Sequence, residues 1–522
     1  MTKQTFLKGT LILIIAGLIT KALGFINRIV MARIMGAEGV GLYMMAVPSL
    51  LLILTLTQMG LPVAIAKLVA EAEARGQHKQ IKRILVVSLA ITGVLSVVFT
   101  TAMIGLAPLV SQALLTDERA FLPLVAIAPI VPIVAISAVL RGYFQGKQNM
   151  KPTAYSQVIE QVVRITLVAV LSTAFLPLGI EYAAAGAMLS VVAGELASLL
   201  YMIFLFKTRK SFRIRRRFFP VVKEGKETFR SLLGIALPTT GGRLIGTTSL
   251  FLEPIVVAQS LAIAGVTTAV ATQQYGLLAG YVVPLLTLPT FITYSLSVSL
   301  VPSLSEAAAK EESGLIHQRL DQALRMALLS GGICVVVLYI FATELMTLMY
   351  DAPHAAGLLK TMAPFALFLY IQGPLQAALQ ALNYAKVSMM NSLFGAIIKT
   401  IAIFALATRP EFGVMGAALA IVAGFILVTL LHFASIAKTT GFTIDMRTIA
   451  KLALLIVATG MVGTFVQKHS FFTLPYLQDA LLSIAITSVV YIGGMFMLGL
   501  IKKSELQHFP LIGRWVMTLG RK

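Results

Sequence analysis

The sequence predicts an all-α polytopic membrane protein with 14 transmembrane helices. Of its 522 residues, 58% are apolar and 12% are charged, whereas soluble domains carry about 25% charged and about 45–50% apolar residues. The mean hydropathy is +0.90. Apolar runs of roughly 20 residues, the length that crosses a bilayer, recur from the N-terminus to the last 25 residues. No stretch is left for a sizeable soluble domain.

The apolar runs divide the chain into fourteen predicted spans. They lie at about 9–33, 42–67, 84–112, 120–141, 153–177, 182–206, 231–260, 273–302, 323–349, 358–383, 389–408, 413–437, 448–467 and 478–501. The first run has the basic start and apolar stretch of a signal peptide. Because Lys21 interrupts that run and no small-residue cleavage site follows, we expect a retained first helix.

Basic residues gather in alternate connections between these spans. If the N-terminus lies inside, internal segments hold 29 of the 42 Lys and Arg residues, and external positions hold five. Positive residues accumulate in the cytoplasmic loops of membrane proteins. The pattern therefore predicts a multi-pass protein of the cell membrane with both termini in the cytoplasm, and it explains the net charge of +21.

The most basic connection is residues 207–230, in which arginines alternate with aromatic residues. Such a segment could bind nucleic acid, but each basic residue near an anionic bilayer surface is also attracted by about 1 kcal/mol. We interpret the segment as an anchor on anionic membrane lipid and expect no nucleic-acid partner.

An internal repeat is present in the sequence. The segments GAMLSVVAG (186–194) and GAALAIVAG (416–424) are identical at six of nine positions. These two segments are offset by 230 residues, and further matches occur at an offset of 235, among them Arg164 with Lys399. Six spans per half place both halves the same way round, with a pseudo-two-fold axis along the membrane normal. Transporters with such parallel repeats bind substrate between the halves.

The repeat predicts the domain organisation. The predicted parts are an N-terminal six-helix lobe (1–206), a basic cytoplasmic linker (207–230), a C-terminal six-helix lobe (231–437), two extra helices (438–502) and a cytoplasmic tail (503–522).

Five basic residues fall within predicted spans: Lys21, Arg28, Arg164, Arg243 and Lys399. Each would cost about 2.5–3.5 kcal/mol at the centre of a lipid-facing helix. We therefore expect them to face protein or a watery cavity, and all five are candidate substrate-binding residues. On the first span, Lys21 and Arg28 share one helical face with two glycines, since these residues recur at intervals of three and four.

Three carboxylates lie deep enough to pair with these cations: Glu160, Glu195 and Glu253. Glu160 precedes Arg164 by four residues, so an ion pair on one helix is expected there. Lys21, Arg28 and Arg243 have no acid within a helical turn. A ligand-facing role and a buried ion pair both stay open for them.

Catalytic and metal-binding motifs are absent from the sequence. No HExxH, GxSxG or P-loop sequence occurs, and the only cysteine, Cys334, lies in an apolar run. We expect no enzymatic activity, no cofactor and no metal.

The stretch TKALGFINRIVMARIMGAEGVGLY (20–43), followed by Leu61-Pro62, resembles the opening of the multidrug/oligosaccharidyl-lipid/polysaccharide exporter superfamily. Within it, the chain is most similar to the MurJ-type lipid II flippases and their sporulation relatives. This resemblance implies alternating access and export of a lipid-linked peptidoglycan precursor for the spore cortex. It also implies that Arg28 and Arg243 line a cationic central cavity. Lys21 stands where the family has arginine, which removes the bidentate fork at that position.

A polyprenyl diphosphate carries about two negative charges, and clustered Lys and Arg bind phosphates. We therefore expect a lipid-linked sugar as substrate, a monomer as the functional form, and a cell-wall polymerase as a candidate partner. The alternatives are a cation-coupled multidrug antiporter of the same superfamily, a flippase for another lipid-linked polysaccharide unit, a membrane-embedded glycosyltransferase and a non-transporting scaffold. An antiporter for cationic drugs would need a deep carboxylate where Lys21 and Arg28 stand.

Overall fold

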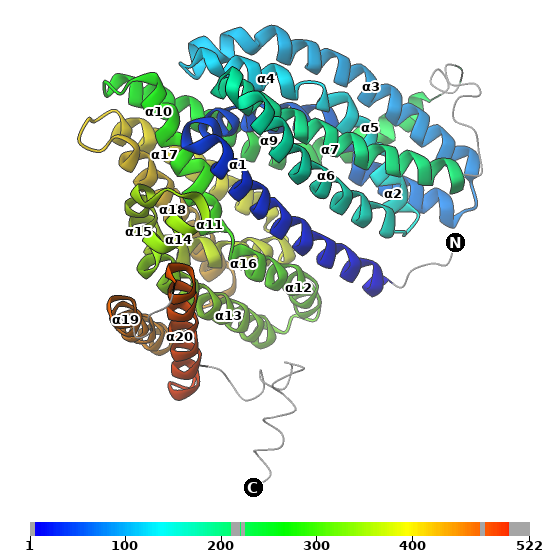
Figure 1. Ribbon diagram of the computed structural model, residues 1–522. Helices are drawn as coiled ribbons and strands as arrows, with labels where there is room; N and C mark the ends of the chain where they lie inside the picture. Colours follow the sequence, from blue (N-terminus) through cyan, green and yellow to red (C-terminus); the bar gives the residue numbers. More distant parts are fainter. Residues whose placement is uncertain (1–5, 210–219, 221–224, 470–474, 501–522) are drawn as a thin grey trace. The chain divides into compact units, whose positions relative to one another are not determined.

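The computed structural model describes residues 6–209, 220, 225–469 and 475–500, and within them the chain forms helices and no strand (Figure 1). The first half contains α1 (Phe6–Gln58), α2 (Leu61–Ala74), α3 (His78–Leu109), η1 (Val110–Leu114), η2 (Glu118–Ala120), α4 (Phe121–Ile127), α5 (Ile130–Gly146), α6 (Lys151–Phe175), η3 (Leu176–Leu178), α7 (Ile180–Arg209) and α9 (Lys226–Ile263).

The second half continues with α10 (Thr268–Tyr275), η4 (Gly276–Val282), α11 (Val283–Thr287), α12 (Thr290–Ala309), α13 (Ser313–Ile340), α14 (Ala342–Tyr350), η5 (Pro353–Ala355), α15 (Ala356–Met362), η6 (Ala363–Phe365), α16 (Ala366–Ala381), α17 (Ala385–Ala407), α18 (Gly413–Thr440), α19 (Met446–Lys468) and α20 (Tyr476–Met497).

The prediction of an all-α membrane protein is confirmed. Among the described residues, 12 helical stretches are long and apolar enough to cross a membrane, and a helix pair bent by 51° raises the number to 13. One stretch, Ile15–Ala74, is 60 residues long. At 1.5 Å per residue it extends about 90 Å, enough for two crossings of a hydrocarbon core about 30 Å thick. The count of fourteen spans stays a prediction.

The first predicted span and most of the second lie on one kinked helix. Helix α1 has 53 residues and contains non-helical backbone at Gly36, with φ 64° and ψ −173°. Glycine adopts this conformation without the steric penalty of a side chain. The second predicted span is interrupted between α1 and α2, where Met59 and Gly60 have φ 44° and 68°.

The repeat seen in the sequence is also present in the secondary structure. Residues 118–127, which form η2 and α4, are followed by a break at Pro129; residues 353–362, which form η5 and α15, are followed by a break at η6. The two sets are offset by 235 residues, the offset of the sequence repeat. The same local fold is therefore built twice along the chain.

The chain forms two compact units. The first comprises residues 1–281 and 396–420, and the second comprises residues 282–395 and 421–522. Helices α9 and α10 therefore associate with the N-terminal helices, and α9 packs against α1, α2 and α3. All eight residues singled out for the site belong to the first unit.

Buried apolar side chains from five helices form a core in the first unit. This core includes Leu61 and Ile65 of α2, Leu85 of α3, Phe144 of α5 and Leu232 of α9. Close packing of α5 on α2 depends on small residues, because a Cβ at Gly142 would lie 2.8 Å from the carbonyl oxygen of Pro62.

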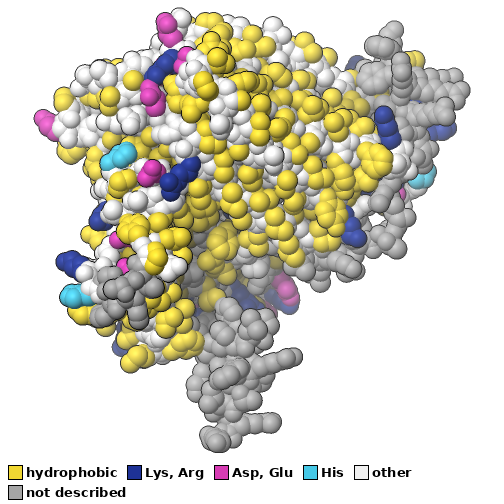
Figure 2. Space-filling view, in the orientation of Figure 1, with side chains coloured by type: hydrophobic (Ala, Val, Ile, Leu, Met, Phe, Trp, Pro, Cys, Tyr) yellow, Lys and Arg dark blue, Asp and Glu magenta, His cyan; other side chains and the backbone are white. Residues whose placement is uncertain are grey.

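The outer surfaces of the long helices are apolar. Val162 of α6 and Leu200 and Phe204 of α7 are all exposed, and apolar side chains dominate the face in Figure 2. Charged side chains are sparse on that face. Such a surface is suited to contact with hydrocarbon.

Candidate functional site

Three helices of the first unit carry most of the predicted site. Helix α1, which carries Lys21 and Arg28, packs against both α6 and α9. Arg164 lies on α6, and Arg243 lies on α9. The glycine-lined face of α1 borders α6, since a Cβ at Gly24 would lie 3.9 Å from Oε1 of Gln161. The fold thus brings the basic stretch of α1 beside the polar side of α6.

Arg28 and Arg243 form no ion pair or side-chain hydrogen bond with any residue that the structure describes. Arg28 is half-buried and Arg243 is exposed. Added Cβ atoms at Gly241 and Gly242, which precede Arg243, would meet no atom within 4 Å. This stretch of α9 is therefore open, and its guanidinium can reach a ligand.

The other basic position on α1, Lys21, is exposed. One turn beyond Gly24 lies Asn27, which is 5% exposed. Its side-chain oxygen Oδ1 has no partner within the described residues. Buried amides are normally satisfied, so Asn27 is a polar group of this helix that the sequence reasoning missed. In the sequence, only the neighbouring Arg28 indicated that Asn27 could belong to the site.

Arg164 is ion-paired with Glu160, the carboxylate that precedes it by one helical turn. Its Nη2 lies 2.5 Å from Oε1 of Glu160. Arg141 contacts the same glutamate at 3.7 Å and donates a hydrogen bond to Glu195 at 2.8 Å. Two arginines and two glutamates from α5, α6 and α7 therefore form one buried network.

Arg141 was not predicted for this network. It lies at the predicted internal end of the span 120–141 and was grouped with the basic residues of a connection. The carboxylate it contacts most closely, Glu195, is 54 residues away in the sequence. No local spacing rule connects two residues so far apart.

Lys399 is paired with Glu253. Its Nζ lies 2.5 Å from Oε2 of the glutamate, and both side chains are 15% exposed. Although Lys399 is the repeat equivalent of Arg164, its carboxylate comes from α9 and not from its own helix. The two repeats thus neutralise equivalent cations in different ways.

A second polar network lies where α1, η2 and α10 meet. Arg119 donates to Asp117 at 2.9 Å and to Glu38 at 2.6 Å, and Thr272 donates to Asp117 at 2.6 Å. Burial alone would raise the pKa of Asp117, but the hydrogen bonds from Arg119 and Thr272 outweigh it and hold that pKa below its usual range. The network joins three segments of the first unit.

Two glycines allow this junction to be tight. A Cβ at Gly41 would overlap the carbonyl oxygen of Thr272, and a Cβ at Gly276 would overlap that of Ala37. Gly41 and Gly276 are separated by the repeat offset of 235, so equivalent glycines of the two repeats meet each other here. The spacing of the two glycines does not by itself predict this contact.

Among the described residues, no group of three or more His, Cys, Asp or Glu side chains could hold a metal ion. The charged groups of the site are instead three ion-paired cations (Arg141, Arg164 and Lys399) and the cations of α1 and α9. Chemically, this arrangement can attract and hold an anion; it contains no nucleophile beside a base.

Comparison with known proteins places the chain in a family. Residues 6–308 match the model described as "Polysaccharide biosynthesis protein", and residues 278–404 match the MatE model. The chain is 57% identical to stage V sporulation protein B of Bacillus subtilis (strain 168) over 517 residues, which are 99% of this chain and 100% of that protein.

More distant relatives are similar over nearly the same length. The lipid II flippase MurJ of Bacillus subtilis (strain 168) is 23% identical over 508 residues, covering 93% of this chain and 92% of that protein. A solved structure of a lipid II flippase MurJ in an inward closed conformation superposes with a TM-score of 0.70 at 16% identity, covering 92% of this chain and 97% of that one.

These similarities confirm the superfamily resemblance, and they confirm that the protein has the fold of a membrane flippase or transporter and is not an enzyme. The 57% identity extends over 99% of the chain, and the polysaccharide biosynthesis model matches more than half of it. The chain therefore belongs to the stage V sporulation protein B family of polysaccharide biosynthesis proteins.

Proposed function

We propose that this protein is a flippase that exports an anionic polyprenyl-diphosphate-linked peptidoglycan precursor of the lipid II type, for the spore cortex, by alternating access. The relative named stage V sporulation protein B supports a role in sporulation, and the relative named lipid II flippase MurJ supports lipid II as the substrate. The diphosphate binds to Lys21, Arg28 and Arg243.

The observation that carries this proposal is that Arg28 and Arg243 have no acidic partner among the described residues. Within the described residues, neither forms an ion pair, and they lie on α1 and α9, which pack together. Cations in membrane helices are costly and are retained where they have a function. Charge-assisted, bidentate contacts are what arginine offers a phosphate.

Arg164 and Lys399 have a different role in this proposal. Each already has a carboxylate within 2.5 Å, so they contribute less net charge to a ligand than Arg28 and Arg243 do. They act on substrate only if it displaces Glu160 or Glu253. The first contacts to the diphosphate come from the cations of α1 and α9.

The membrane potential favours this direction of transport. With the interior negative and both termini inside, outward movement of two negative charges gains about 4.6 kcal/mol per 100 mV. The sugar cannot cross hydrocarbon unaided, whereas the polyprenyl tail can stay in the bilayer. The protein acts as a monomer, and a cell-wall polymerase would use the exported precursor.

A cation-coupled multidrug antiporter is the second candidate, because residues 278–404 match the MatE model. A site for cationic drugs needs a carboxylate that is available to the drug. Glu160, Glu195 and Glu253 are all engaged by basic side chains. This arrangement favours the anionic substrate.

Native mass spectrometry of the full chain tests the substrate class. We expect the purified protein to retain or bind an added undecaprenyl-diphosphate lipid, and the Arg28→Ala, Arg243→Ala double variant to lose it. Binding of a cationic drug with no binding of the diphosphate lipid would contradict the proposal and favour the antiporter.

A further inference from the structure

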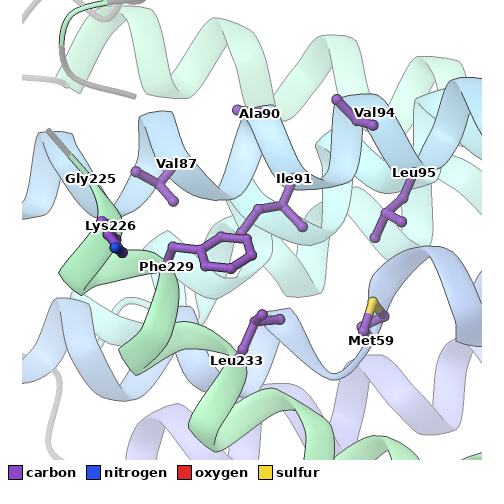
Figure 3. Close-up of a pocket in the computed structure, with 10 residues that line it drawn as sticks. All are labelled: Met59, Val87, Ala90, Ile91, Val94, Leu95, Gly225, Lys226, Phe229 and Leu233. Carbon is purple, nitrogen blue, oxygen red and sulfur yellow. The ribbon is translucent and has the colours of Figure 1, made fainter. Parts of the chain in front are cut away.

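An apolar groove lies on the first unit between α3 and the beginning of α9. It has a volume of about 510 Å³ and is lined by Met59, Val87, Ala90, Ile91, Val94, Leu95, Gly225, Lys226, Phe229 and Leu233 (Figure 3). That volume falls within the range of about 300–1,000 Å³ typical of small-molecule sites. The groove contains none of the residues of the proposed diphosphate site.

The groove is formed by matching helical faces. The α3 residues recur at intervals of three and four from Val87 to Leu95, and the α9 residues Lys226, Phe229 and Leu233 do the same. Residues with this spacing share one face of a helix. Met59 contributes from the break between α1 and α2, where its φ is 44°.

The groove has one polar end. In Figure 3, Lys226 lies at one end beside Val87, while Met59 and Leu95 lie at the other end. Lys226 is the only charged residue among those that line it. An apolar channel with an ammonium at its entrance matches an amphiphile with a negative headgroup.

Further basic residues surround the polar end. Arg83 precedes Val87 by four residues and so lies on the same face of α3, and the exposed Arg230 follows Lys226 by one turn. The one acidic residue in the first turn of α9 is Glu227. Of these four charged residues, all within the described part of the chain, three are basic, and this balance is complementary to an anionic headgroup.

The length of the groove matches one leaflet. Val87 and Leu95 are eight residues apart, about 12 Å along a helix that rises 1.5 Å per residue. Half of a hydrocarbon core about 30 Å thick is about 15 Å. The apolar lining therefore extends through most of one leaflet and ends at Met59 and Leu95.

We propose that this groove binds one acyl chain of an anionic glycerophospholipid, with the phosphate beside Lys226 and Arg83 and the chain along Ile91 and Val94. The bound lipid fills the space between α3, α9 and the Met59–Gly60 break, and so supports the packing of α9, the helix that carries Arg243. A polyprenyl chain is longer than one leaflet and does not match a groove that ends at Leu95.

Native mass spectrometry with added phosphatidylglycerol and phosphatidylcholine tests the proposal on the full chain. We expect phosphatidylglycerol to be retained in preference to phosphatidylcholine. Ile91→Trp, which fills the groove, should lower its retention at least ten-fold. Lys226→Gln should lower retention about five-fold, because one basic residue attracts anionic lipid by about 1 kcal/mol at the bilayer surface. Val162→Trp, on the exposed apolar surface of α6 (51% exposed), is the matched control and should retain the lipid.

Equal retention in Ile91→Trp and Val162→Trp, or equal retention of the two lipids by the unsubstituted chain, would overturn the proposal. If Ile91→Trp does not fold, Ala90→Leu fills the same groove with a smaller change. A photoreactive residue in place of Val94 shows by crosslinking which molecule or segment occupies the groove. A phosphatidylglycerol adduct supports the proposal, whereas crosslinks to residues 210–224 of the chain itself or to an added polyprenyl lipid contradict it. These readouts do not depend on transport, so their failure leaves the proposed function untouched.

Discussion

At the scale of single residues, the basic residues of the candidate site include ion-paired side chains and two, Arg28 and Arg243, that form no ion pair within the described residues. Arg164 and Lys399 lie within 2.5 Å of a glutamate, and Arg141 within 2.8 Å of another. Removing one member of a buried pair leaves an uncompensated charge, which is much more costly than removing both. We therefore expect substitution of a paired cation to affect stability first, and, under the proposed function, substitution of Arg28 or Arg243 to affect ligand binding first.

Glu253→Gln tests the structural role of the Glu253–Lys399 pair. The substitution leaves the Lys399 ammonium in a site that is 15% exposed, so we expect a loss of about 3–5 kcal/mol in the free energy of unfolding. Thermal unfolding in detergent measures it. The Glu253→Gln, Lys399→Met double variant should recover most of the loss. A changed substrate preference with an unchanged melting temperature would show instead that Glu253 selects the ligand.

Sequence spacing predicted only some of these contacts. Glu160 and Arg164 lie one helical turn apart, so their pairing follows from helix geometry alone. Glu253 and Lys399 are 146 residues apart, and Arg141 meets a glutamate on another helix. Such pairs depend on how the helices pack against one another. The residue pattern of a single sequence does not show which helices are neighbours.

At the scale of elements, the junction of α1, η2 and α10 is held by polar contacts as well as by close packing. Asp117 is 2% exposed and accepts hydrogen bonds from Arg119 and Thr272. Gly41 and Gly276 permit the backbones to approach. Because this junction joins α10 to α1, it limits how far these two helices can separate.

The carboxylate of Asp117 makes this junction sensitive to acid. Its folded-state pKa lies below the usual value, so the ionised group stabilises the fold above pH of about 4, and this contribution is lost as pH falls through the folded-state pKa. Asp117→Asn should lower stability at pH 7 by about 2 kcal/mol, since hydrogen bonds to a charged group contribute about 1.5–3 kcal/mol.

Thermal unfolding from pH 7 to pH 3 checks this prediction. The difference in melting temperature between the natural chain and Asp117→Asn should narrow below pH of about 4. Glu411→Gln, which changes an exposed carboxylate, is the control and should have little effect at any pH. A difference for Asp117→Asn that stays constant with pH would contradict the assigned role of its charge.

The helices were more predictable than their breaks. Long apolar runs require helices in a bilayer, because every backbone polar group must be satisfied internally. The kink at Gly36 and the break at Met59–Gly60 have weaker signals, since glycine is frequent in membrane helices for several reasons. The association of α9 and α10 with the N-terminal helices had no signal in the sequence.

At the scale of the whole molecule, the uneven distribution of Lys and Arg predicts the orientation in the membrane. In a Cys334→Ala background, which has no other cysteine, we expect Gln77→Cys to react with a membrane-impermeant thiol reagent only from the cytoplasmic side. Thr267→Cys should react only from outside. Both positions are exposed. Labelling of both from the same side would contradict the predicted orientation.

The most direct test of the proposed transport is translocation of an undecaprenyl-diphosphate-linked sugar in proteoliposomes. We predict measurable flux for the natural chain and at least a ten-fold loss for Arg28→Ala and for Arg243→Ala, because each removes a charge-assisted contact worth about 1.5–3 kcal/mol. Arg409→Ala, an exposed arginine away from the site, should transport normally. Unchanged flux in both Arg28→Ala and Arg243→Ala would contradict the account, since the diphosphate would then be held elsewhere.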